Sequence, residues 1–230
     1  MTAKGKMIEL KGDEGFALGA YHVTPADCGA DANGQGLVLV QEIFGVTDHI
    51  KELCDGYAAR GFDVIAPSMY DRGEKNWQSD YSGPGFKRSI ELAQQCGVSH
   101  AQGDIQAAIV FLKEDGASAV HITGYCYGGS IAWLAACRCE GLASAVGYYG
   151  RLIMDMEDET PKVPTMLHFG EHDASIPIDW VRKFKEKRKD VTVHIYDADH
   201  GFNSDRREHY SKEAADLALE RTLDWFAAAS

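Results

Sequence analysis

Short apolar runs alternate with amphipathic segments along most of the chain. Two runs, 7–10 (MIEL) and 16–23 (FALGAYHV), flank Gly12–Gly15 and predict an antiparallel hairpin at a sheet edge. The run at 36–42 (GLVLVQE) is apolar at nearly every position, which is typical of a strand buried on both faces of a parallel sheet. Further runs of this kind predict strands at 62–67, 118–124, 143–150, 164–170 and 191–197.

Segments with apolar residues every three or four positions lie between these strands. They predict helices at 47–59, 85–96, 102–114, 127–138, 178–189 and 207–227. Strands and helices that alternate in this way imply right-handed crossovers and a mostly parallel sheet with helices on both faces. No repeat, low-complexity tract or linker interrupts the pattern, so we expect residues 1–230 to form a single α/β domain.

Composition and charge narrow the class of partner. The 230 residues are 45% hydrophobic and 25% charged, as in an ordinary soluble globular protein. The net charge of -12 opposes binding to nucleic acid or to an anionic membrane surface, because both repel an acidic protein. The N-terminal MTAKGKMIELKG lacks the apolar core of a signal peptide, and no apolar run has the length of a membrane span. We therefore expect a cytoplasmic monomer or small homo-oligomer that binds neither nucleic acid nor membrane.

The cysteines are too sparse and irregular for a disulfide framework, and we expect them to be reduced. They occur at 28, 54, 96, 126, 137 and 139. Cys137 and Cys139 form a Cys-Arg-Cys pair, but a second Cys/His pair at the spacing of a zinc site is missing. We expect no metal and no cofactor.

One cysteine occupies an unusual turn. The segment GYCYGG, 124–129, lies where a predicted strand ends and a predicted helix begins, and Cys126 has Gly124 and Gly128 two positions to either side. This spacing is typical of a nucleophile elbow, in which the glycines leave room for a tight, strained turn. The helix N-terminus behind such a turn favours a thiolate and a developing oxyanion. The alternative is that Cys126 is a small buried apolar residue and the glycines merely allow close packing.

Two further residues follow strand ends. Asp173 lies after the predicted strand 164–170, and His200 lies after the predicted strand 191–197. Each has a structural alternative, because Asp173 would also serve as a helix cap and His200 as a loop histidine. With Cys126, however, they reproduce the nucleophile, acid, histidine order of α/β-hydrolases, which predicts a catalytic triad.

The segment QEIFGV, 41–46, follows the buried strand 36–40. In a hydrolase of this kind the second oxyanion donor comes from this place, and the backbone N–H of Ile43 fits that role. Glu42 is unexpected at the end of an apolar strand, because a buried carboxylate needs a partner. The alternative for Glu42 is a salt-bridged structural acid.

At this point the sequence resembles the dienelactone hydrolase family, the carboxymethylenebutenolidases, which have the α/β-hydrolase fold. The matching landmarks are QEIFG, GYCYGG, AVGYYG, the Asp of GEHD, the His of DADHGF and the terminal RTLDWF, and they span residues 41 to 226. Nearly the whole chain is covered. The resemblance implies a cysteine hydrolase that opens enol-lactones bearing a carboxylate.

The resemblance also implies a role for each site residue. Glu42 would contact the resting thiol of Cys126 and help to deprotonate it once substrate binds. His200 would be the imidazolium partner of the thiolate and would assist hydrolysis of the thioester, while Asp173 would orient His200. The oxyanion would be held by the backbone N–H groups of Ile43 and Tyr127.

The chain departs from the family at the residues that bind the substrate carboxylate. The family uses arginines, one of them four residues beyond the triad histidine, and that position here is Ser204. Arg206 and Arg207 follow slightly later, and Arg88 roughly matches the other arginine. Arg206 and Arg88 are therefore the candidate carboxylate-binding residues, with Phe44 as a further substrate contact. The alternative for either arginine alone is plain surface charge.

Two other functions remain open on the sequence alone. A class I glutaminase also has a cysteine on such a turn, but its triad usually ends His-x-Glu, whereas this chain has His200-Gly201-Phe202. A redox sensor or binding protein would use Cys126 as a reactive thiol and Cys137 or Cys139 to resolve it. Helix geometry opposes that hypothesis, because eleven residues of helix would separate the thiols of Cys126 and Cys137 by about 16 Å, which is too far for a disulfide.

Overall fold

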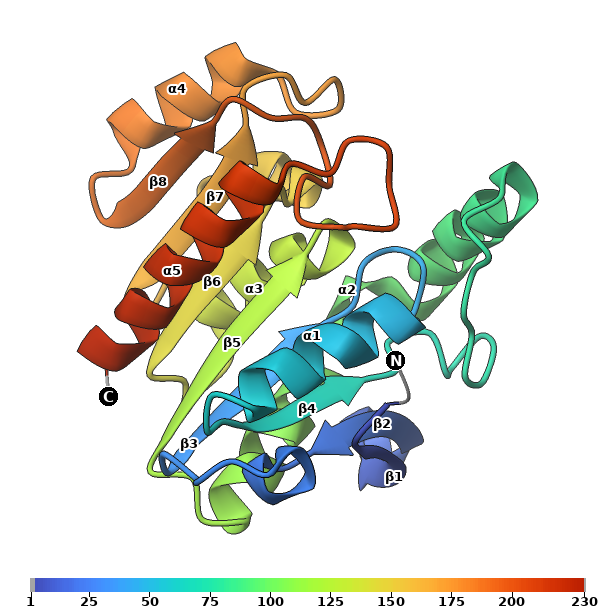
Figure 1. Ribbon diagram of the computed structural model, residues 1–230. Helices are drawn as coiled ribbons and strands as arrows, with labels where there is room; N and C mark the ends of the chain where they lie inside the picture. The colour runs from blue at the N-terminus through green and yellow to red at the C-terminus, as the bar shows by residue number, and fades with distance from the viewer. Residues whose placement is uncertain (1–2, 230) are drawn as a thin grey trace.

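A computed structural model describes residues 3–229, which form one eight-stranded sheet with helices around it (Figure 1). The strands are β1 (Lys6–Lys11), β2 (Ala17–Val23), β3 (Gln35–Val40), β4 (Asp63–Pro67), β5 (Ala119–Tyr125), β6 (Ser144–Tyr148), β7 (Thr165–Gly170) and β8 (Val191–Tyr196). Their spatial order is β1-β2-β4-β3-β5-β6-β7-β8. The pairs β1–β2 and β2–β4 are antiparallel and the other pairs are parallel. The predicted mostly parallel sheet with an N-terminal hairpin at its edge is confirmed.

Helices cover both faces of this sheet, as the alternating pattern predicts. They are α1 (Asp48–Ala58), α2 (Gly83–Glu114), α3 (Tyr127–Arg138), α4 (Ile178–Lys187) and α5 (Lys212–Ala228), with short 3-10 helices at Asp13–Gly15, Pro25–Cys28 and Arg151–Met156. Figure 1 shows α1 and α5 in front of the sheet and α2 and α3 behind it. Within residues 3–229, none of the helices has the length and apolar character needed to cross a membrane.

Two predicted helix boundaries need correction. The two helices predicted at 85–96 and 102–114 are the two halves of α2, which is kinked at Gly97, where φ is +69° and ψ is 156°, and the second half begins before residue 102. The helix predicted from residue 207 begins only at Lys212, because the Ser211 side chain caps it by accepting a hydrogen bond from the Ala214 N–H. The residues before Ser211 form tight turns instead, which leaves a loop between β8 and α5.

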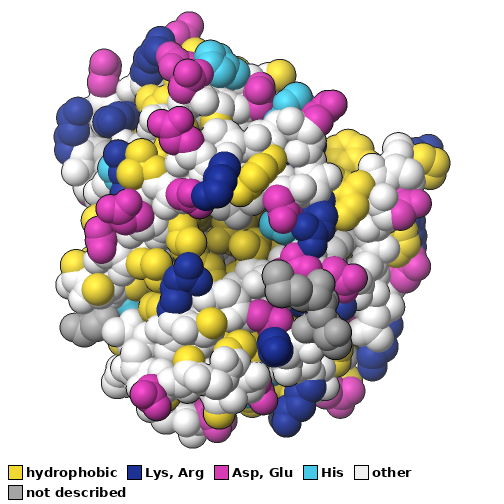
Figure 2. Space-filling view, in the orientation of Figure 1, with side chains coloured by type: hydrophobic (Ala, Val, Ile, Leu, Met, Phe, Trp, Pro, Cys, Tyr) yellow, Lys and Arg dark blue, Asp and Glu magenta, His cyan; other side chains and the backbone are white. Residues whose placement is uncertain are grey.

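The central strands are shielded from water on both faces. Leu37, Val38, Leu39 and Val40 of β3 are all 0% exposed, which explains the continuous apolar run in the sequence. Figure 2 shows hydrophobic side chains gathered at the base of a hollow near the middle of the face that carries α1 and α5, with charged side chains scattered around it.

A buried polar network lies between the sheet and α5. Thr222 Oγ1 donates to the Ala218 carbonyl at 2.8 Å and contacts Tyr148 Oη at 2.7 Å and His168 Nε2 at 3.2 Å. His168 Nδ1 lies 2.8 Å from Tyr196 Oη. Burial lowers the pKa of His168 well below its usual value, so its ring is neutral and donates through Nε2 to Thr222. The network therefore joins β6, β7 and β8 to α5 through a single hydroxyl.

We expect Thr222→Val to lower the free energy of unfolding by about 1–3 kcal/mol, because it leaves the buried His168 Nε2 without a partner and removes the 2.7 Å hydrogen bond of Tyr148 Oη. Thr222→Ser keeps the hydroxyl and should lose much less. Urea unfolding of the three proteins measures the difference. A valine variant as stable as the wild type would show that the network does not stabilise the fold.

Candidate active site

Cys126 sits at a strained turn between β5 and α3. Its φ is 56° and its ψ is -113°, a backbone conformation that costs a non-glycine residue about 1–3 kcal/mol. A Cβ on Gly124 would lie 2.1 Å from the Gly128 carbonyl oxygen, and a Cβ on Gly128 would lie 2.3 Å from the Val40 carbonyl oxygen. Only glycine fits at either place. The close packing that these glycines allow projects the thiol from the carboxyl edge of the sheet.

The structure brings Cys126, His200 and Asp173 into one chain of contacts. His200 Nε2 lies 3.2 Å from Cys126 Sγ, and His200 Nδ1 lies 2.6 Å from Asp173 Oδ2. The other carboxylate oxygen of Asp173 accepts hydrogen bonds from the backbone N–H of Ser175 at 2.8 Å and of Ile176 at 3.1 Å. One carboxylate oxygen of Asp173 is thus held by its own loop while the other holds the imidazole. The hydrogen bonds within the loop therefore do not compete with the contact to His200.

The charges of His200 and Asp173 follow from their hydrogen bonds. Burial works to lower the pKa of His200, but the hydrogen bonds to Asp173 and Cys126 outweigh it and raise the pKa to about 10. Burial works to raise the pKa of Asp173, but its hydrogen bond to His200 and those from Ser175 hold it below the usual value. At neutral pH the pair is therefore an imidazolium beside a carboxylate. An imidazolium next to the thiol favours the thiolate, yet it has no free nitrogen to accept the thiol's proton.

Glu42 is a buried acid without a hydrogen-bond partner. It is 1% exposed, and within the described residues neither of its carboxylate oxygens contacts a donor. Burial raises its pKa to about 7, although the positive charges of Arg207 and His200 oppose that rise. Among the described residues Glu42 forms no salt bridge, so the alternative of a salt-bridged structural acid is not supported. Nor does Glu42 contact the resting thiol as the resemblance implies, because the thiol lies against His200 instead.

The two predicted oxyanion donors lie on neighbouring segments. Tyr127 is the first residue of α3, and Ile43 lies in the loop after β3, against which Gly128 of α3 packs. Among the described residues, neither backbone N–H donates to another backbone group. The loop turns at Gly45, where φ is +90° and a Cβ would lie 2.1 Å from the Trp77 carbonyl oxygen. This turn packs the loop against Trp77 and Gln78, and Gly45 forms an antiparallel bridge with Gln78.

The predicted substrate contacts occupy different environments. Phe44 is 4% exposed and packs beneath the rings of Tyr81, at 4.5 Å between centroids, and Phe86, at 6.0 Å. Phe86 is 45% exposed, so the outer surface of this aromatic group is formed by Phe86 and Tyr81 more than by Phe44.

Both arginines predicted to bind a carboxylate are already paired with acids of this chain. Arg88 contacts Glu74 at 3.1 Å and Glu91 at 3.4 Å. Arg206 contacts Glu52 and Asp205.

Arg207 is the arginine that the sequence prediction did not select. Its guanidinium carbon lies 5.6 Å from the centroid of the Phe44 ring. Its positive charge opposes the rise in the pKa of Glu42 that burial causes. Within residues 3–229 no acid pairs with it. The sequence gives the pair Arg206-Arg207, but the direction of each side chain depends on the turn formed by Gly201, Ser204 and Arg207.

Among the described residues, two groups of three side chains lie close enough together to hold a metal ion. They are Asp13, Glu14 and His100, and His22, Asp63 and Asp115. His100 and His22 are each already hydrogen-bonded to an aspartate, at 2.7 Å in both cases. Neither group contains Cys126, Asp173, His200, Cys137 or Cys139.

Comparisons with known proteins identify the family of this chain. A sequence profile of the dienelactone hydrolase family matches residues 18–230. A Methylorubrum extorquens protein named putative carboxymethylenebutenolidase is 32% identical over 90% of this chain and 75% of its own. The carboxymethylenebutenolidase of Pseudomonas putida is 30% identical over 96% of this chain and 95% of its own.

A solved structure extends the likeness to three dimensions. The crystal structure of a putative dienelactone hydrolase from Klebsiella pneumoniae superimposes with a TM-score of 0.84 and 31% identity, covering 97% of this chain and 98% of that one. With the sequence match, this similarity shows both fold and family. The chain belongs to the dienelactone hydrolase family and is a hydrolase that acts on ester or lactone bonds.

Proposed function

We propose that this enzyme opens an enol-lactone through a thioester on Cys126, with Glu42 as the base that takes the thiol's proton. The contact chain from Cys126 through His200 to Asp173 carries the proposal. His200 is already charged at neutral pH, whereas Glu42 changes its protonation state near pH 7. A group that titrates close to the working pH is the better general base.

Acylation follows from these charges. Glu42 accepts the proton, the sulfur attacks the lactone carbonyl, and the N–H groups of Ile43 and Tyr127 stabilise the oxyanion. When the oxyanion collapses, the ring C–O bond breaks. The enolate that leaves takes a proton from the His200 imidazolium, which becomes neutral.

Deacylation uses the neutral imidazole that acylation leaves. His200 takes a proton from water, and the resulting hydroxide equivalent attacks the thioester carbonyl. The carbon–sulfur bond breaks, Cys126 leaves as a thiolate beside the restored imidazolium, and the proton held by Glu42 returns to the sulfur. One water is consumed for each lactone opened.

Arg207 supports a substrate with a carboxylate. Arg88 and Arg206 are each engaged by two acids, whereas Arg207 lies over the Phe44 ring with no acid paired to it in the described part of the chain. Ser204, which replaces the family's arginine, is 0% exposed and cannot meet a substrate at the surface. Arg207 would therefore supply the positive charge, with Tyr81 and Phe86 as an apolar wall beside it.

The alternative functions are less well supported. A resolving cysteine for a redox sensor must form a thiolate, but burial raises the pKa of Cys137 to about 12 and of Cys139 to about 11. A glutaminase would place a glutamate two residues beyond His200, where this chain has Phe202, which is 0% exposed. The cytoplasmic location, the lack of a nucleic-acid partner and the oligomeric state stay predictions.

The proposed thioester is tested by alanine substitution of Cys126, His200 and Asp173. Because the three act as one unit, each single change should reduce kcat at least about 100-fold, and the triple variant should be little worse than Cys126→Ala. Intact-protein mass spectrometry during turnover of p-nitrophenyl acetate should detect an acetyl adduct on the wild type but not on Cys126→Ala. Near-normal turnover by His200→Ala would refute the triad.

The raised pKa of Glu42 predicts a pH-dependent gain in stability for Glu42→Gln. When the pKa of a carboxyl group rises from 4.5 to about 7 on folding, the folded protein loses stability as the pH rises through that range. Glutamine does not ionise, so the variant avoids this loss. The variant's advantage over the wild type should therefore be about 2–3 kcal/mol greater at pH 8 than at pH 5. Urea unfolding at the two pH values measures it, with the exposed Glu186→Gln on α4 as a control that should show no such difference. A pH-independent effect at Glu42 would mean that its carboxyl group is not strained by burial.

Arginine substitutions test the substrate class. We expect Arg207→Ala to reduce kcat/KM about ten- to a hundredfold for a carboxylate-bearing enol-lactone, because a charge-assisted contact contributes roughly 1.5–3 kcal/mol. The methyl ester of the same lactone should be little affected. Arg206→Ala is the matched control and should change neither rate much. Equal losses on both substrates would exclude carboxylate binding by Arg207, and a selective loss in Arg206→Ala instead would assign it to Arg206.

A further inference from the structure

Tyr149 lies at the same level of the sheet edge as Glu42 and Cys126. The register pairs Val40 of β3 with Gly124 of β5, and Gly124 with Gly147 of β6. Two positions further along the three strands come Glu42, Cys126 and Tyr149. The thiol-bearing turn is therefore flanked by the glutamate on one side and the tyrosine on the other.

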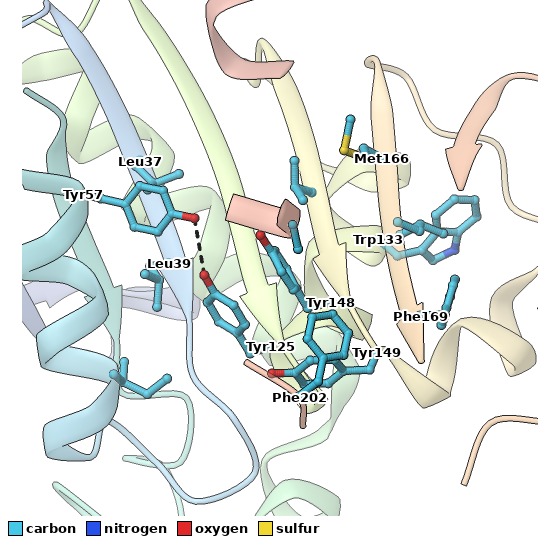
Figure 3. Close-up of a cluster of buried hydrophobic side chains, with 14 of the residues drawn as sticks. Leu37, Leu39, Tyr57, Tyr125, Trp133, Tyr148, Tyr149, Met166, Phe169 and Phe202 are labelled. Carbon is cyan, nitrogen blue, oxygen red and sulfur yellow. Dashed lines mark hydrogen bonds between the residues drawn. The ribbon is translucent and has the colours of Figure 1, made fainter. Parts of the chain in front are cut away.

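The backbone of Tyr149 is held in a conformation that disfavours a side chain. Its φ is 38°, in the left-handed region where glycine is preferred. Its N–H donates to the His168 carbonyl at 2.7 Å, and its ring lies edge-on to His200 at 5.0 Å and to Phe202 at 5.2 Å. Figure 3 shows it beside Tyr148 and Phe202. Strain of this kind concentrates at functional sites, and here it directs an aromatic ring toward the triad histidine.

The hydroxyl of Tyr149 has no partner in the described part of the chain, although the residue is 0% exposed. Other buried tyrosines of the same cluster are satisfied: Tyr57 and Tyr125 bond to each other at 3.3 Å (Figure 3), and Tyr148 bonds to Thr222. Buried polar groups are nearly always paired, so an orphan phenol at an active site points to a partner that it meets during the reaction.

Within residues 3–229, Glu42 lacks a hydrogen-bond donor, which the Tyr149 hydroxyl could provide. Both of its oxygens are buried acceptors that lack a donor, and the phenol is a donor that lacks an acceptor. Burial first, and then the charge of Glu42 and that of Cys126 in its thiolate form, raise the pKa of Tyr149 well above its usual value, with Tyr148 adding to this and Arg207 opposing it. Tyr149 thus keeps its proton at every pH at which the enzyme would work, and remains a donor.

We propose that Tyr149 is a positioning residue for Glu42: once substrate is bound, its hydroxyl donates a hydrogen bond to the Glu42 carboxylate and holds it ready to take the proton of Cys126. This inference rests on the proposed role of Glu42 as the base. Tyr149 itself exchanges no proton with the substrate and forms no bond to it.

The test is Tyr149→Phe, which removes one oxygen and keeps the ring against His200. Loss of a donor to the carboxylate makes Glu42 harder to ionise in the substrate complex, so the acidic limb of kcat against pH for p-nitrophenyl acetate should move upward by about one pH unit. The melting temperature should stay the same or rise, because the hydroxyl removed has no partner in the resting fold. A merely structural tyrosine would give the opposite result, a lower melting temperature and an unmoved limb.

Tyr57→Phe is the matched control. It removes the same atom from a buried tyrosine whose hydroxyl does have a partner, Tyr125. This variant should lose stability and leave the pH profile in place.

The double variant Glu42→Gln/Tyr149→Phe separates the failure of this inference from the failure of the proposed function. In the Glu42→Gln background, Tyr149→Phe should cause no further loss of kcat. If Glu42→Gln is severely impaired but Tyr149→Phe leaves the limb unmoved, Tyr149 does not act on Glu42 and this inference alone is wrong. If Glu42→Gln turns over like the wild type, Glu42 is not the base and both are wrong.

Discussion

The hydrogen bond between His200 and Asp173 determines the chemistry of this site. At 2.6 Å, with the carboxylate held from behind by the N–H groups of its own loop, it keeps the imidazole charged at neutral pH. A charged histidine stabilises a thiolate but cannot generate one. The proposed mechanism therefore needs a second group that titrates near neutrality, and the buried Glu42 would supply it, because burial raises its pKa to about 7.

The fold brings these groups together by ordinary parallel-sheet geometry. The strands β3, β5 and β6 are neighbours, so the residues that follow them share one edge of the sheet. Glycines at 124 and 128 allow the N-terminus of α3 to reach the end of β3, which places Cys126 and Tyr127 next to the segment that carries Glu42 and Ile43. Backbone strain at Cys126 and Tyr149 marks where the chain departs from regular structure in order to aim a side chain.

Much of this arrangement could be predicted from the sequence, because it depends on order and spacing. Strand exits identify Cys126, Asp173 and His200, and the apolar run before Glu42 indicates its burial. The choice between Arg206 and Arg207 could not be made, because adjacent residues point differently according to loop turns that leave no periodic signal. Tyr149 was missed for a similar reason: its positive φ and unpaired hydroxyl exist only once β6, β7 and the His200 loop have packed. The resting contact of Cys126 with His200 instead of Glu42 likewise depends on side-chain geometry that spacing does not specify.

The charge of His200 in the free enzyme is the most direct test of this mechanism. Nitrogen-15 NMR of the histidine side chains reports whether both ring nitrogens carry protons, and His200→Gln identifies the signal. We predict that His200 is doubly protonated at pH 7 and loses a proton only above about pH 9, with its Nδ1 proton shifted far downfield by the bond to Asp173. A His200 ring that is neutral at pH 7 and titrates near 6.5 would contradict the mechanism, because the histidine itself would then be free to deprotonate Cys126.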